Sequence, residues 1–304
     1  MKPLKIVVWL SSLIVVLVLV ATAIGLFYQN GGSPFSFTTL RGQIVQIYGQ
    51  GLYHYDTPLL ALGNKAGDAV TLVVGIPLLV VSMLLYRRGS LRGGLLLTGV
   101  LAYFLYYYGS MAFGTAYNPL FLVYVAVFSA SLFAFVLIFR SFDIAALSGR
   151  FSTRLPRRGI AVLMFAAGLS LVVVWIGLSI VPALLQGKAP AEVGSYTTAI
   201  TEVVDLGVIV PALTLTGFLV LRRVALGYLL ASTILVFTAV LGANLITAGI
   251  VQLLAGVVTT GQFIGFTVPF GILTLFDIWL TVVLFRNFSE PATWRSATLR
   301  AAHV

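Results

Sequence analysis

Asp277 stands near the middle of a long apolar stretch, where a carboxyl group is suited to carrying a proton or binding a cation. It precedes Arg286 by nine residues, and a helix of that length covers about 13 Å. A carboxylate at this depth in a bilayer costs about 2.5–3.5 kcal/mol and is typical of an ion pathway, a proton relay or a buried pair. No Lys or Arg is expected at the same depth, so the expected partners are neutral: Asn244, Gln262 or a tyrosine. A protonated Asp277 in a structural hydrogen bond is the alternative.

Three further acids begin apolar stretches at the opposite end. Glu202 and Asp205 are three residues apart, so on a helix they share one face. Asp68 starts a comparable polar stripe that continues through Thr71, Gly75 and Ser82. If two such helices face each other, the stripes form an outer vestibule that binds a cation or a proton. Alternatively, the carboxylates cap helix N-termini, where the helix dipole stabilises them by about 0.3–1 kcal/mol.

A run of tyrosines provides a candidate pocket. Tyr103, Tyr106 and Tyr107 fall on one face at helical spacing, together with Ser110 and Gly114. Aromatic residues in the outer third of a membrane helix are typical of an interfacial belt. The alternative is a pocket with polar edges that stacks a flat or lipid-like ligand.

The segment 41–58 resembles a piece of a soluble β protein. Residues 44–48 and 52–55 flank Gly49-Gln50-Gly51 and predict two short strands joined by a glycine turn. Asp56-Thr57-Pro58 then predicts the start of a short helix that runs toward Lys65. Because a lone hairpin is marginal in water, it is expected to pack on the outer helix ends and on loop 186–200. His54 and Asp56 are expected to form the polar tip of this outer cap.

The elements that must position these residues are membrane helices. The chain has 304 residues, of which 60% are hydrophobic and 9% are charged, and that composition is typical of an all-α polytopic membrane protein. A bilayer core takes about 20 helical residues. Eight apolar stretches reach this length, near 6–28, 69–86, 93–114, 118–139, 159–185, 201–221, 225–248 and 262–285.

The basic residues predict the orientation of these helices. Of 18 Lys and Arg residues, only Arg41, Lys65 and Lys188 fall on the side opposite the termini. The positive-inside pattern therefore predicts a cell-membrane protein with a cytoplasmic N-terminus and C-terminus. The net charge of +10 is then explained by topology and predicts anionic inner-leaflet lipids as partners rather than nucleic acid. The first apolar run is too long for a usual signal peptide, which favours a retained helix.

The two halves of the chain carry the same marks in the same order. Each has an acid, then a proline, then a pair of arginines, and each half closes on Phe-Arg-x-Phe, at residues 139–142 and 285–288. This order predicts a 4+4 parallel internal repeat, an arrangement found in transporters. The first half is residues 1–150, including the outer loop 29–67 with its hairpin, the second is 151–291, and 292–304 is a cytoplasmic tail.

Composition also excludes several classes of chemistry. There is no cysteine, and the two histidines, His54 and His303, are far from the apolar core, so no metal site and no cofactor are expected. No nucleotide-binding or hydrolase motif occurs. The sequence favours a transporter or channel-like permease for a small cation, a proton-coupled solute or a lipophilic molecule. The alternative is a non-catalytic module that binds a partner protein or lipid through its outer hairpin; a lipid-modifying enzyme that uses His54 and Asp56 is a third and weaker hypothesis. The sequence does not predict the oligomeric state.

Overall fold

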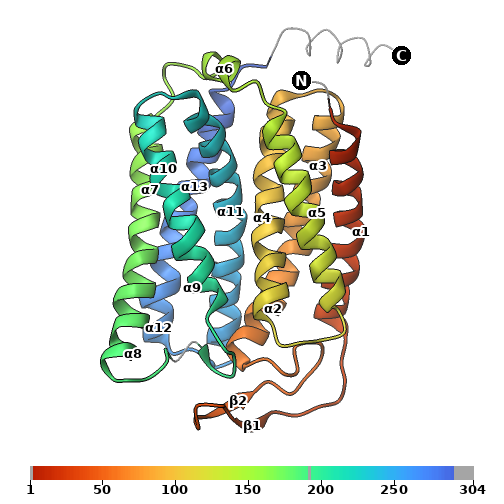
Figure 1. Ribbon diagram of the computed structural model, residues 1–304, viewed down its shortest axis with the longest axis vertical. Coiled ribbons are helices and arrows are strands. Elements are labelled where there is room, and N and C mark those ends of the chain that lie inside the picture. Colours follow the sequence, from red (N-terminus) through yellow and green to blue (C-terminus); the bar gives the residue numbers. More distant parts are fainter. Residues whose placement is uncertain (1–2, 191–192, 291–304) are drawn as a thin grey trace.

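The computed structural model describes residues 3–190 and 193–290 of the chain (Figure 1). Both termini lie at one end of a helical bundle, and a small two-stranded sheet lies at the other. We call these the terminal end and the hairpin end. The sequence expectations for His303 and the tail 292–304 lie outside the described residues.

Within the described part of the chain, eight helices are long and apolar enough to cross a membrane, which confirms the predicted multi-pass membrane protein. We number these spans 1 to 8 in chain order. Their bounds are Lys5–Phe27, Pro58–Arg87, Leu91–Gly114, Phe121–Arg140, Arg157–Leu185, Ile200–Leu221, Ala225–Leu254 and Thr260–Arg286.

Four spans are single α-helices, and four are interrupted by a wider π-helical turn. The uninterrupted ones are α1 (Lys5–Phe27), α4 (Leu91–Gly114), α5 (Phe121–Arg140) and α11 (Ala225–Leu254). Span 2 consists of α2 (Pro58–Val70), η1 (Thr71–Gly75) and α3 (Ile76–Arg87), and span 5 of α7 (Arg157–Val172), η3 (Val173–Ile180) and α8 (Val181–Leu185). Span 6 consists of α9 (Ile200–Val204), η5 (Asp205–Ile209) and α10 (Val210–Leu221), and span 8 of α12 (Thr260–Gln262), η6 (Phe263–Thr267) and α13 (Val268–Arg286). A short α6 (Ile144–Leu147) and a 3₁₀ turn, η2 (Ser148–Arg150), lie in the linker between spans 4 and 5.

A proline explains each π-helical turn. Pro77, Pro182, Pro211 and Pro269 each occupy the first turn of the α-helix that follows a π segment. Proline has no N–H and its ring clashes with the preceding turn, so a continuous α-helix cannot pass through it. Widening the preceding turn is one local adjustment by which a membrane helix accommodates the proline.

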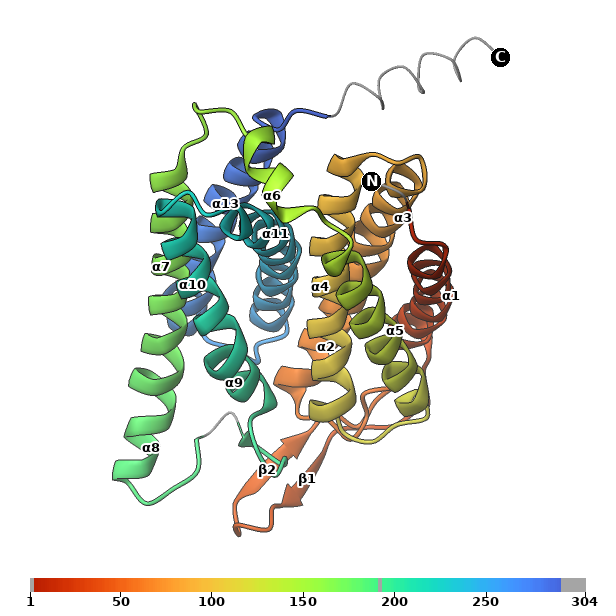
Figure 2. The same ribbon diagram turned by 45° about the horizontal axis from the view of Figure 1, so that its top comes forward.

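The bundle forms two groups of four spans (Figures 1 and 2). Spans 1–4, coloured red to yellow, lie on one side, and spans 5–8, coloured green to blue, lie on the other. Their central contact is made by α4 and α11. Gly99 allows the close approach, because a Cβ there would lie 2.5 Å from Cβ of Val236. Small residues at such crossings let membrane helices pack backbone to backbone.

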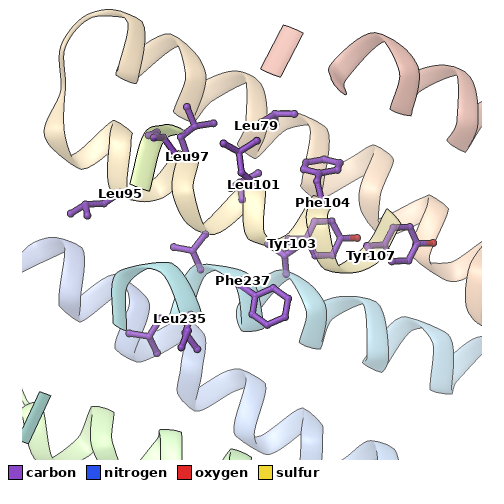
Figure 3. Packing of buried hydrophobic residues seen from close by; sticks show 14 of the residues in the cluster. Leu79, Leu95, Leu97, Leu101, Tyr103, Phe104, Tyr107, Leu235 and Phe237 are labelled. Carbon is purple, nitrogen blue, oxygen red and sulfur yellow. The ribbon is translucent and has the colours of Figure 1, made fainter. Parts of the chain in front are cut away.

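Span 3, α4, is the most deeply buried of the eight spans, and Figure 3 shows its side chains Leu97, Leu101 and Phe104. These side chains are fully buried on the side of α4 that faces away from α11, as is Leu79 of α3, and Leu235 of α11 is fully buried as well. The second group of spans is less tightly closed. Span 5 packs on span 8 through α7 and α13, in the half of the bundle nearer the terminal end.

The hairpin differs from its predicted pairing. The expected sheet between spans 1 and 2 is present, but β2 (Ile44–Ile47) pairs antiparallel with the upstream β1 (Phe35–Thr38), in the register Phe35 to Ile47. Residues 52–55 instead form a turn, in which the amide of Gly49 donates to the carbonyl of His54 over 2.9 Å. The alternation Phe-Ser-Phe-Thr in 35–38 was the sequence signal for the true partner strand.

Span 2 also begins earlier than its predicted start near residue 69. It runs as one interrupted helix from Pro58, and the short helix predicted toward Lys65 is its first part. Glycines made this segment resemble a loop, but they serve packing: a Cβ on Gly67 would lie 2.3 Å from Oη of Tyr107. Gln252 Nε2 also donates to the carbonyl of Leu59 over 2.8 Å, which joins span 2 to α11.

At the terminal end, residues 287–290 tie the two groups of spans together; we call this segment the terminal strap. The amide of Ser152 donates to Asn287 O, and that of Ser289 to Arg150 O, each over 2.9 Å. Glu290 then caps α4, because its Oε1 accepts from Ser90 Oγ at 2.6 Å and from the Arg92 amide at 2.8 Å. The strap therefore joins span 8 to the linker and to the first turn of span 3.

Candidate functional site

Two adjoining hollows lie between the second group of spans and spans 2 and 3 of the first group. The deep chamber has a volume of about 340 Å³ and is bounded by spans 2, 3 and 5–8. The hairpin-end chamber has a volume of about 660 Å³ and extends to Tyr196 and Ala199 in the loop before span 6. Both share Tyr107, Ser110 and Trp175 in their walls, so they form one cavity that runs from the hairpin end into the bundle.

Asp277 lies in the wall of the deep chamber and is 3% exposed. Its Oδ2 lies 2.8 Å from the hydroxyl of Thr238 on α11. Its Oδ1 has no hydrogen-bond partner within the described residues. The partner predicted from sequence was wrong: Asn244 lines the same chamber, but the contact is made by a threonine.

Asp205 lies in the same chamber, on η5 of span 6. Its Oδ1 accepts a hydrogen bond of 2.7 Å from the Tyr106 hydroxyl, and its Oδ2 accepts one of 2.9 Å from Trp175 Nε1. Both donors are neutral. These two hydrogen bonds join three spans, because Asp205 is on span 6, Tyr106 is on α4 of span 3 and Trp175 is on η3 of span 5. Asp205 is thus oriented by hydrogen bonds while its charge is not balanced by these donors.

Glu202 lies one turn earlier on α9, in the wall of the hairpin-end chamber. Ser179 Oγ donates to its Oε1 over 3.0 Å. Along the cavity the order from the hairpin end is therefore Glu202, Asp205 and Asp277. Within residues 3–190 and 193–290, no three acidic or histidine side chains come close enough together to hold a metal ion.

The cavity wall is strongly biased in charge. No Lys, Arg or His is present among the described residues that line either chamber. The rest of the deep chamber is mainly aliphatic and aromatic, with Leu241, Phe270 and Leu273 as examples. A ligand in this space meets carboxyl groups and apolar surface, with no basic side chain to neutralise the acids.

Asp68 is separated from this cavity. It is buried in span 2, where its Oδ2 accepts a 2.6 Å hydrogen bond from the Tyr53 hydroxyl. The expected stripe of Asp68, Thr71, Gly75 and Ser82 is buried along its whole length. The predicted vestibule between two facing acidic stripes is therefore wrong. The helix-capping alternative for Asp68 is also wrong, because span 2 begins at Pro58.

The three tyrosines divide between two environments. Tyr106 and Tyr107 line the deep chamber, and the Tyr107 hydroxyl donates to the carbonyl of Asn64 over 3.2 Å. Tyr103 is fully buried, with its hydroxyl 2.6 Å from that of Thr71, and its ring stacks on that of Tyr107. All three are inside the bundle, so the expected interfacial aromatic belt is wrong for them.

His54 and Asp56 do not form an exposed polar tip. Asp56 is fully buried, and its Oδ1 accepts from the Ala116 amide at 2.8 Å and from the Tyr196 hydroxyl. Burial raises the pKa of Asp56 to about 6, although these two hydrogen bonds act in the opposite direction. His54 Nδ1 lies 3.1 Å from Asn30 Nδ2. The two residues therefore have different partners and do not combine into an acid–base pair.

The expected contact between the outer hairpin and loop 186–200 is present. Arg41 Nη2 donates to the carbonyl of Tyr196 over 2.8 Å, and the Tyr196 hydroxyl contacts Asp56. Tyr196 also lines the hairpin-end chamber. The segment between spans 1 and 2 is thus connected to the cavity wall through one residue.

Sequence reasoning missed Trp175, Thr238 and Tyr196. Trp175 carried a signal, since an indole N–H placed in an apolar helix needs an acceptor. Thr238 carried none, because a threonine in a helix usually bonds its own preceding turn, and this one also donates to Ile234 O over 2.7 Å. Tyr196 lies in a loop whose path could not be predicted.

In comparisons with known proteins, no family model, curated protein or solved structure matches this chain.

Proposed function

We propose that this protein is a transporter or channel-like permease that moves a small cation, a proton-coupled solute or a lipophilic molecule through the cavity between its spans. The observation that carries the proposal is that Asp205 and Asp277, from spans 6 and 8, line one deep chamber. Carboxyl groups inside a membrane bundle are costly, and a cavity lined by them is typical of an ion or substrate pathway.

The hydrogen bonds of these acids support the same proposal. A structural carboxylate in a protein interior is normally balanced by a cation or by several charge-stabilising donors. Asp277 has a single hydroxyl contact, and the donors to Asp205 are a phenol and an indole. A cation or a proton in the chamber would supply the missing positive charge.

The orientation is part of this proposal. The arginine-rich turns at the terminal end favour a cytoplasmic location for both termini, next to anionic inner-leaflet lipids in the cell membrane. The hairpin-end chamber then opens toward the extracytoplasmic side, and the terminal strap lies on the cytoplasmic side. In this state a substrate would enter from outside.

A 4+4 repeat accounts for the shared construction of spans 2 and 6. In both, a five-residue π segment is followed by a 12-residue α-helix, and the next long helix begins at Leu91 in one half and at Ala225 in the other. We propose that the two groups of spans are descended from one four-helix unit. Transport by a change in their relative position would follow from that architecture.

Flux into proteoliposomes tests the proposal. Purified full-length protein is reconstituted, and uptake of ⁸⁶Rb⁺, entry of protons reported by pyranine and uptake of tetraphenylphosphonium are measured against protein-free liposomes. At least one flux should exceed the control and fall tenfold or more in Asp277→Asn. Asp68→Asn is the matched control, since it removes a buried carboxylate outside the cavity. No flux above protein-free liposomes for any of the three would overturn the proposal.

The alternative function, a membrane module that binds a partner through its outer hairpin, is favoured by a separate observation. Leu40 at the hairpin tip is 97% exposed and Ile44 is 73% exposed. Clustered exposed apolar side chains are typical of interaction sites. Replacing both with serine should abolish capture of that partner in crosslinking experiments on intact membranes; unchanged crosslinks would exclude the hairpin as the binding surface.

A further inference from the structure

Asp277 carries the strongest unexplained feature of the deep chamber. The residue is 3% exposed, and its Oδ1 has no hydrogen-bond partner within the described part of the chain. A buried carboxyl oxygen left without a partner destabilises the folded protein, because it loses its hydrogen bonds to water and gains none. The same oxygen belongs to a side chain in the wall of a cavity of about 340 Å³, so a ligand in the chamber can satisfy it.

The contact with Thr238 depends on whether Asp277 is protonated. The Thr238 hydroxyl has one hydrogen but lies 2.7 Å from Ile234 O and 2.8 Å from Asp277 Oδ2. When Asp277 is protonated on Oδ2, its O–H donates to Thr238 Oγ1 and Thr238 donates to Ile234 O, so both hydroxyl hydrogens have an acceptor and only the uncharged Oδ1 lacks a partner. When Asp277 is ionised, Thr238 must turn its hydrogen toward one of two acceptors. The neutral form therefore needs no counter-ion from the described wall, which has no basic residue, whereas the ionised form needs a cation.

The other groups that face the deep chamber add negative charge or none. Its titratable groups besides Asp277 are Asp205 on span 6 and Tyr106 and Tyr107 on span 3. Span 5 contributes Trp175 and aliphatic side chains such as Met164. No basic residue is present among the described residues of the wall, so an anionic ligand would meet repulsion and a cationic one would be attracted.

The surroundings also select the kind of cation. A bare metal ion takes about six or more oxygen ligands, whereas the neighbours of Asp277 in the wall include Leu241 and Leu273. An organic cation places its charge near carboxyl groups and aromatic faces and covers the aliphatic wall with its apolar body. Pockets for such molecules have volumes of about 300–1,000 Å³, and the two chambers fall within this range.

Building on the proposed transport function, we infer that the cavity binds a lipophilic organic cation, which displaces the proton of Asp277. The cation pairs with the carboxylate as the proton leaves the carboxyl oxygen for water in the cavity, so one positive charge replaces another. Proton entry on the same residue releases the cation. Asp205, which accepts hydrogen bonds from Tyr106 and Trp175, supplies a second negative charge nearer the hairpin end of the same chamber.

A pair of probes with the same shape and opposite charge tests the inference. Full-length protein in lipid nanodiscs is dialysed to equilibrium against tetraphenylphosphonium or tetraphenylborate, with empty nanodiscs subtracted. The wild-type protein should bind the cation saturably and at least tenfold more tightly than the anion. Equal affinity for both probes would overturn the inference. This comparison needs no variant, so it stands even if a substitution prevents folding.

Proton release identifies the residue. In weakly buffered solution at neutral pH, binding of tetraphenylphosphonium to the wild-type protein should release up to about one proton per cation, read with an indicator dye. Asp277→Asn should lose that release and at least tenfold in affinity, Asp277→Glu should recover both in part, and Asp68→Asn should behave as wild type. Unchanged affinity and proton release in Asp277→Asn would overturn the role of that residue.

The two proposals fail separately. Binding that discriminates between the probes without flux of any solute leaves the cation site standing and removes the transport function. Flux in proteoliposomes without a preference for tetraphenylphosphonium over tetraphenylborate leaves transport standing and removes the cation site.

Discussion

Trp175 Nε1 lies 2.9 Å from Asp205 Oδ2, so a single indole joins span 5 to span 6 inside the wall of the cavity. Asp205 is 5% exposed, and a buried acceptor that loses its donor costs about 1–3 kcal/mol. The hydrogen bond therefore stabilises the part of the bundle where span 5 packs least on span 8.

Trp175→Phe should lower the thermal unfolding temperature of the purified protein, because it removes the N–H and leaves Asp205 Oδ2 without this donor. Circular dichroism at 222 nm follows the unfolding. The pair Trp175→Phe and Asp205→Leu forms a double-mutant cycle, in which contacting residues typically show a coupling of about 0.5–3 kcal/mol. Additive effects of the two substitutions would mean that the contact contributes nothing.

Gly25→Ala should destabilise the first group of spans. A Cβ at Gly25 would lie within van der Waals overlap of Asp68 Oδ2, and it would reach 2.9 Å from the Tyr53 hydroxyl. The clash displaces the Asp68 carboxylate, which accepts a hydrogen bond from Tyr53, and overpacking of this kind costs about 1–3 kcal/mol. Gly207→Ala is the control, since a Cβ there meets nothing within 4 Å. Equal unfolding temperatures for the two variants would contradict the packing.

The outer cap should respond to pH through Asp56, whose pKa is raised from 3.8 to about 6. Because the native state holds this proton more tightly than the unfolded chain, the free energy of unfolding is highest below the unfolded pKa and falls as pH rises through the folded one. A difference of this size is worth about 3 kcal/mol at most.

Asp56→Asn should remove this pH dependence, because the amide oxygen still accepts from Ala116 and Tyr196 but cannot ionise. Hydrogen exchange of the Ala116 amide, corrected for its intrinsic rate, should show protection that falls between pH 4 and 7 in the wild type and stays level in the variant. Parallel pH profiles in the two proteins would show that another group is responsible.

Glu290→Ala should loosen the terminal strap. Its carboxylate accepts hydrogen bonds from Ser90, Leu91 and Arg92 at the first turn of α4, and loss of such a cap costs about 0.5–2 kcal/mol. Exchange of the Leu91 and Arg92 amides should accelerate, while Ser289→Ala, which keeps its backbone contact with Arg150, should leave it unchanged. The strap interpretation fails if both variants exchange at the same rate.

Much of the fold could be predicted because the sequence patterns that indicate it extend over many residues. Eight apolar stretches of bilayer length and the sorted arginines need no detail of packing to be recognised. The start of span 2 was misplaced because Gly63, Lys65 and Gly67 look like loop residues, and only the contact of this segment with α11 and Tyr107 makes them helical. The strand partner of 44–47 was missed because the nearer glycine turn offered a competing pairing.

The acids of the site could be predicted, but their relations could not. Asp277 is conspicuous because an intramembrane carboxyl group is rare, and that argument depends on one residue and its depth. Which hydroxyl contacts it, and which acids share a cavity, depends on how the helices are rotated about their axes. Asp68 and Asp205 look alike in sequence, yet only Asp205 lies in the cavity, whereas Asp68 is buried against Tyr53 and Gly25 of α1.

The π-helical turns change the direction in which side chains point along spans 2, 5, 6 and 8. Each π turn holds about one residue more than an α-turn, and one residue corresponds to about 100° of rotation around a helix. In spans 2, 5, 6 and 8, the side chains on either side of the interruption therefore point in directions that a single helical wheel does not relate. An insertion or deletion of one residue in these segments would reorient the hairpin-end acids relative to Asp277 without shortening a span. The side-chain register before each π segment can therefore change independently of the register after the proline.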